Sequence, residues 1–113
     1  MADRWHESKI VSNHVTRIVP SYDKDQPDPG YLLVALSHPI LGRPLIIRNA
    51  FGTEVPEIVP DDLARIPIPR ISDSAERKIG RLASEATDEW AKAREMEAGA
   101  VGILESELQK ILN

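Results

Sequence analysis

Apolar residues recur at every third or fourth position through the C-terminal third of the chain. Those from Ile79 to Ile111 have a mean spacing of about 3.6 residues, which is the repeat of an amphipathic helix. No proline interrupts this region, and Asp73 followed by Glu76 is a variant of the capping box that begins many helices. The pattern predicts a single helix over residues 73–112, about 60 Å long.

The apolar stripe of this helix is too long for a small domain to cover from one side. We therefore predict that it pairs with a second helix as a coiled coil, in this chain or in another. The alternative, packing against the N-terminal part of the same chain, is expected for the first two turns only. Gly99 and Gly102 mark a kink or a close backbone approach, or are simply weak points in the helix. The residues predicted to form the pairing interface are Ile79, Leu82, Ala86, Trp90, Ala93, Met96, Leu104, Leu108 and Ile111.

The N-terminal part of the chain has the pattern of short strands and short helices. The β-branched segment from Ser8 to Pro20 predicts two short strands or one bent strand. After a polar loop, Tyr31 to Leu36 predicts a short helix capped by Asp28, with Pro29 in its first turn. A second helical stretch is predicted between Ile40 and Ala50. The predicted fold class is therefore α/β (α+β), a small globule of short strands and helices followed by one long helix.

Prolines and aliphatic residues alternate irregularly between Ala50 and Ser72. Because each proline removes a backbone donor and pushes the residue before it toward extended geometry, this segment cannot be one regular element. Its "IPIP" run is predicted to hold Ile66 and Ile68 in an extended ribbon with buried side chains. Such a ribbon would fix the globule rigidly to the long helix. An ordinary strand at a sheet edge is the alternative, and it would bury the same two isoleucines.

Composition restricts the classes of protein that remain. The 113 residues are 42% hydrophobic but only 4% aromatic, so one domain with an aliphatic core is expected. No cysteine is present, which excludes disulfides and thiolate metal sites and agrees with the cytoplasmic location that we expect. No apolar run is long enough to span a membrane, and the first nine residues lack the apolar region of a secretory signal. The net charge of −4 disfavours an autonomous nucleic-acid-binding domain.

No group of residues in the sequence has a spacing that indicates catalysis. His6, His14 and His38 lie far apart and match no metal-binding pattern, and no serine lies in a nucleophile elbow. The adjacent Asp61 and Asp62 would point to different sides of a helix. We interpret them as first-turn residues stabilised by the helix dipole rather than as a catalytic pair. The chain is therefore predicted not to be an enzyme and to use no metal or cofactor.

The order of the motifs resembles a known family. "SNHVTRIVP" (Ser12 to Pro20) precedes "YLLVALSHPILGR" (Tyr31 to Arg43), and "AFGTEVPEIVPDDLARIPIPRIS" (Ala50 to Ser72) leads into the long helix. This ordered set resembles the specificity subunits of type I restriction–modification systems, from about Lys9 to Leu112. The resemblance implies that residues 1–71 are the C-terminal part of a target recognition domain and residues 72–113 a spacer helix. In that family, spacer helices pair antiparallel between two recognition domains and dock methyltransferase subunits, and specificity subunits have no catalytic activity.

The chain departs from the family pattern in length and charge, since a full recognition domain is longer and a second domain and helix are missing.

If the chain reads DNA, arginine can bind guanine edges bidentately, asparagine can pair with adenine, and both can reach phosphates. A surface or capping role is the alternative for each candidate. The expected partners are double-stranded DNA within a complete assembly, a methyltransferase subunit or second specificity piece, and a second copy of the chain, with no membrane. The alternative function is an assembly factor derived from such a subunit that no longer binds DNA. The candidate DNA contacts are Arg17, Arg43, Arg48, Asn49 and Thr53.

Overall fold

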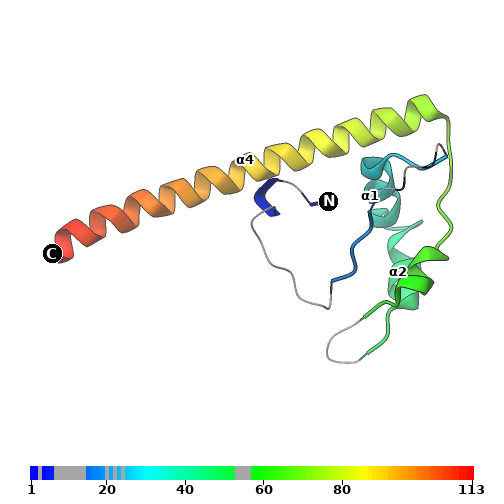
Figure 1. Ribbon diagram of the computed structural model, residues 1–113, viewed down its shortest axis with the longest axis horizontal. Coiled ribbons are helices and arrows are strands. Elements are labelled where there is room, and N and C mark those ends of the chain that lie inside the picture. Colours follow the sequence, from blue (N-terminus) through cyan, green and yellow to red (C-terminus); the bar gives the residue numbers. More distant parts are fainter. Residues whose placement is uncertain (3, 7–14, 20, 22, 24, 53–56) are drawn as a thin grey trace. The chain divides into compact units, whose positions relative to one another are not determined.

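The computed structural model describes residues 1–2, 4–6, 15–19, 21, 23, 25–52 and 57–113. The chain forms two compact units, one of residues 10–84 and one of residues 1–9 with 85–113. Figure 1 shows the elements in chain order, which are the 3₁₀ helix η1 (Arg4–His6) and the α-helices α1 (Pro29–Ser37), α2 (Arg43–Asn49), α3 (Pro60–Ala64) and α4 (Asp73–Leu112).

The prediction of an α/β fold is wrong, because the described residues contain no strand. Their only ladder-like pairing is an isolated antiparallel bridge, in which Phe51 and Glu57 exchange two backbone hydrogen bonds of 2.7 Å. Residues 15–19 of the predicted strand segment form no regular element, and their side chains are exposed; residues 8–14 and Pro20 lie outside the described residues. A β-branched composition favours extended backbone, but a strand also needs a neighbour to receive its hydrogen bonds.

The prediction of a short helix behind Asp28 is confirmed by α1. One carboxylate oxygen of Asp28 accepts hydrogen bonds from the backbone N–H groups of Gly30 and Tyr31, at 2.8 and 3.2 Å. These bonds satisfy two of the donors that have no partner inside a helix. Pro29 occupies the first helical position, where its missing N–H has no cost. The cap therefore explains why the helix starts at this residue.

The other two short helices also lie where the pattern placed helical residues. The predicted stretch between Ile40 and Ala50 contains α2, and α2 contacts both α1 and α3. Asp61 and Asp62 lie in the first turn of α3, as predicted. Gly52 has a φ angle of 99°, which glycine adopts without strain, and it follows the bridging residue Phe51.

Within the unit of residues 10–84, α1 meets α4 at two glycines. A Cβ atom on Gly30 would lie 2.4 Å from the carbonyl oxygen of Gly80, so only glycine permits this approach. Among the described residues of this unit, the buried hydrophobic ones are Tyr31, Ala35 and Ile66. Burial of Ile66 agrees with the prediction for the "IPIP" run, and Ile68 is half-buried. The Tyr31 hydroxyl donates a hydrogen bond to the backbone carbonyl of Pro69 and ties α1 to this run.

The prediction of one long helix is confirmed by α4, whose 40 residues are Asp73–Leu112. The start of the helix differs from the predicted capping box. Ser72, rather than Asp73, is the capping residue, and its hydroxyl accepts a hydrogen bond from the backbone N–H of Ala75 at 3.4 Å. The Glu76 carboxylate instead accepts from the backbone N–H of Ile71 at 3.1 Å. No helix in the described part of the chain is long and apolar enough to cross a membrane.

Candidate functional site

The predicted pairing stripe of α4 is largely uncovered in the isolated chain. Trp90 retains 66% of its maximal exposure, Met96 75% and Ile111 78%. Leu82, Leu104 and Leu108 are also exposed, as are Ala86 and Ala93, whereas Ile79 is half-buried. Exposed apolar side chains at helical spacing along one element are typical of a protein–protein interface.

Further apolar residues near the C-terminus of α4 widen this stripe and were not among the predicted pairing residues. Val101, Ile103 and Leu112 are all exposed. They lie beside the stripe rather than on its centre line. A selection of positions strictly three or four residues apart therefore does not include them. Together with Leu104, Leu108 and Ile111, they make the last three turns of α4 its most apolar exposed part.

In the unit of residues 1–9 and 85–113, α4 is covered on the side that faces away from the apolar stripe. Ala91 is fully buried, and one turn later Glu95 forms an ion pair of 2.9 Å with Arg4 of η1. At 3.6 residues per turn, Ala91 points about 140° away from Leu104. The described contacts of the N-terminal segment are therefore made on the back of the helix, and the stripe stays open.

The two candidate DNA-contacting arginines of α2 do not lie on one face of that helix. Arg43 and Arg48 lie on α2, five residues apart, so they project about 140° from each other around the helix. The Asn49 side-chain amide donates to the Leu45 carbonyl oxygen of the same helix, at 2.8 Å. Arg17 lies in the exposed segment before α1, and Thr53 lies outside the described residues. These residues were chosen from the sequence because their side chains can bind bases or phosphates. The geometry of α2 points two of them, Arg43 and Arg48, in different directions.

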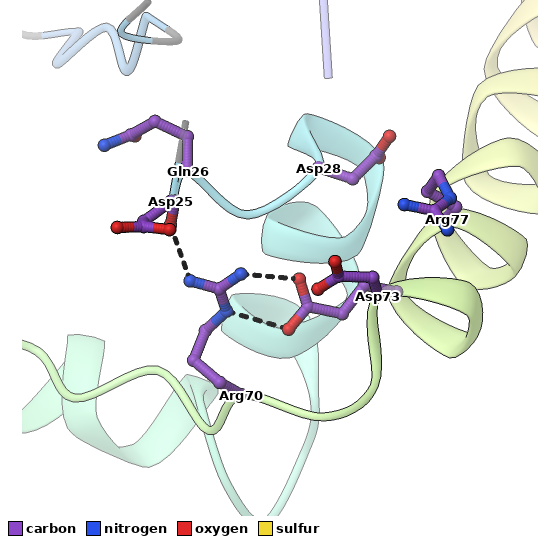
Figure 2. Close-up of a pocket in the computed structure, with 7 residues that line it drawn as sticks. Asp25, Gln26, Asp28, Arg70, Asp73 and Arg77 are labelled. Carbon is purple, nitrogen blue, oxygen red and sulfur yellow. Dashed lines mark hydrogen bonds and ion pairs between the residues drawn. The ribbon is translucent and has the colours of Figure 1, made fainter. Parts of the chain in front are cut away.

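A polar cluster at the start of α4 was not anticipated from the sequence. Figure 2 shows the Arg70 side chain with a hydrogen bond to Asp25. The Arg70 guanidinium donates to Asp25 at 2.7 Å and to both Glu76 oxygens, at 2.8 and 3.1 Å. Glu76 is buried, whereas Arg70 is partly exposed. The cluster borders an open pocket of about 280 Å³ that is also lined by Gln26, Asp28, Asp73 and Arg77.

The hydrogen bonds around Glu76 lower the pKa of its carboxyl group. The bond from Arg70 has the largest effect, and the Ile71 N–H and the positive charge of Arg70 act in the same direction; burial opposes them. The same hydrogen bond raises the pKa of Arg70. Both groups are thus charged at neutral pH, and the pair ties the segment before α4 to its first turn. We interpret the cluster as a structural clamp.

Among the described residues, no group of three or more histidine or acidic side chains is placed to hold a metal ion. Two of the charged residues that line the pocket, Arg70 and Glu76, are bonded to each other. The exposed stripe of α4 is therefore the strongest candidate for a functional surface.

Comparisons with known proteins leave the family of this chain open. No protein-family model, no curated protein and no solved structure matches it. The resemblance to specificity subunits accordingly stays a prediction.

Proposed function

We propose that this chain is a non-catalytic specificity subunit of a type I restriction–modification system, or a piece of one, and that it assembles by pairing α4 with the α4 of a second copy. The observation that carries the proposal is the uncovered apolar stripe of α4. Burying apolar surface stabilises by about 25 cal/mol per Å², so a helix of this length gains from a partner along much of its stripe. The role places the chain in the cytoplasm.

Substitutions on and off the stripe test the assembly step. Leu104→Glu puts a charge on the stripe, whereas Ser106→Glu adds the same charge on the far side of the same turn. In sedimentation velocity experiments, we expect wild type and Ser106→Glu to form dimers and Leu104→Glu to sediment as a monomer. Dimers of equal stability in all three proteins would contradict a role for the stripe.

DNA recognition belongs, in this proposal, to the dimer and to larger assemblies that contain it. The experiment is a gel shift with random duplexes over a series of salt concentrations, with dimer formation verified beforehand. Each phosphate contact contributes close to one unit to the slope of log affinity against log salt. Because a dimer carries each arginine twice, we therefore expect Arg43→Gln and Arg48→Gln each to weaken binding and reduce that slope by about 2. Arg65→Gln, which removes an exposed arginine directly after α3 and outside the candidate set, serves as the control.

A second candidate function is an assembly factor that does not read DNA. The divergent directions of Arg43 and Arg48 and the net charge of −4 favour it. Verified dimers that shift no duplex even at low salt would support this alternative and contradict DNA recognition by the dimer.

A further inference from the structure

The turn between α1 and α2 is organised by one residue, His38. The Nδ1 atom of its ring accepts hydrogen bonds from the backbone N–H groups of Ile40 and Leu41, at 3.2 Å each. Its backbone carbonyl oxygen accepts from the N–H groups of Gly42 and Arg43, at 3.1 and 3.0 Å. Four consecutive backbone donors therefore have the same residue as their acceptor.

This turn matters for α2 because the helix has no cap of its own. No described side chain caps its N-terminus, and none of its seven residues is buried. Pro44 has no N–H group, and the N–H groups of Leu45 and Ile46 bond to the Gly42 carbonyl oxygen, at 3.0 and 3.2 Å. The donors that come before them are the ones that His38 binds. The residue thus does for α2 what a capping side chain does for other helices.

The same turn is also fixed to α1. The backbone N–H of His38 donates to the Ala35 carbonyl oxygen at 3.4 Å, where α1 ends. Gly42 is buried, and a Cβ atom there would lie 2.0 Å from that same carbonyl oxygen. The direction in which α2 leaves α1 is therefore set at this turn.

We infer that His38 is a positioning residue for Arg43, which is the first residue of α2 and a candidate DNA contact. The inference rests on the proposed function and adds to it a residue that acts without touching DNA. The ring closes the turn, and the closed turn holds the His38 carbonyl oxygen against the N–H of Arg43. Since the direction of a side chain follows the backbone of its own residue, opening the turn would redirect the Arg43 guanidinium.

Substitutions of His38 separate the acceptor from the rest of the ring. His38→Asn keeps an acceptor, because its Oδ1 atom is as many bonds from the backbone as Nδ1 is in histidine. His38→Leu removes the acceptor and keeps an apolar side chain. We expect the amide hydrogens of Ile40 and Leu41 to exchange with solvent about 5-fold faster in His38→Leu than in wild type, and at the wild-type rate in His38→Asn. Equal exchange rates in all three proteins, measured by nuclear magnetic resonance, would overturn the inference.

Gel shifts over a series of salt concentrations, with dimer formation verified beforehand, test the link to Arg43. We expect His38→Leu to weaken binding about 10-fold and to reduce the salt slope by up to about 2, as Arg43→Gln does, and His38→Asn to bind as wild type does. The double variant His38→Leu with Arg43→Gln should bind no more weakly than Arg43→Gln alone, because the contact is already lost. Additive losses, an unchanged slope or a weakened His38→Asn would each show that the ring does not act through Arg43.

The two experiments distinguish failure of this inference from failure of the proposed function. If wild-type dimers shift no duplex, DNA recognition fails and the role of His38 toward DNA fails with it, whereas the exchange rates still show whether the ring holds the turn. If wild type binds DNA and His38→Leu binds equally well, only the positioning role is overturned.

Discussion

Replacing Gly80 by alanine should destabilise the chain, although alanine is the better helix former. The added Cβ would lie 1.8 Å from the Oδ1 atom of Asp28, which is the acceptor that caps α1. The carboxylate must move, and the N–H groups of Gly30 and Tyr31 then lose their partner. Overpacking costs about 1–3 kcal/mol and a lost cap about 1 kcal/mol, whereas the gain in helix propensity is about 1 kcal/mol. We expect a net loss of about 1–3 kcal/mol.

Gly99→Ala is the matched control, because it makes the same change in the same helix. An added Cβ at Gly99 meets nothing within 4 Å, so only the propensity gain of about 1 kcal/mol remains. The assay is urea denaturation followed by far-ultraviolet circular dichroism, with the midpoints of both variants compared with wild type. If Gly80→Ala is stabilised to the same extent as Gly99→Ala, the close approach of α1 and α4 at this residue is refuted.

Two other contacts give measurable predictions. Glu76→Gln removes the charge that Arg70 binds, and we expect it to lower the thermal midpoint by a few degrees at neutral pH. Because the pKa of Glu76 is lowered by folding, its contribution is complete above the usual glutamate pKa and is lost as pH falls through the lowered value. Thermal scans at decreasing pH should therefore show the two proteins converging in acid, and a constant difference would contradict the clamp. Tyr31→Phe leaves the Pro69 carbonyl without its donor, and urea denaturation should show a loss of about 1 kcal/mol; an unchanged midpoint would contradict the bond.

The elements that were predicted correctly have local causes. Asp28 and Pro29 adjoin the helix that they start, and the repeat that predicts α4 is contained within α4 itself. The strand prediction failed for the opposite reason, since a β-branched segment such as residues 15–19 becomes a strand only beside another strand. The local sequence pattern shows which backbone conformation a segment prefers, but it does not show whether a second strand lies beside that segment.

The long-range contacts inside each unit join residues far apart in the sequence. Arg4 reaches Glu95, and Tyr31 reaches Pro69, and nothing in the local pattern relates either pair. Gly80 was visible in the sequence as a glycine within a helix. What requires a glycine there is the Asp28 carboxylate, 52 residues earlier, which occupies the place of a Cβ atom. The candidate pairing surface could be predicted because an amphipathic stripe is a local property. The directions in which Arg43 and Arg48 point could not be predicted until the first and last residues of α2 were known.

The molar mass in solution tests the central claim most directly. Light scattering on wild-type protein over a series of concentrations should give about 25 kDa at high concentration, twice the 12.6 kDa of one chain. A mass of one chain at every concentration would show that the stripe of α4 does not pair with a second copy, and would contradict the proposed assembly.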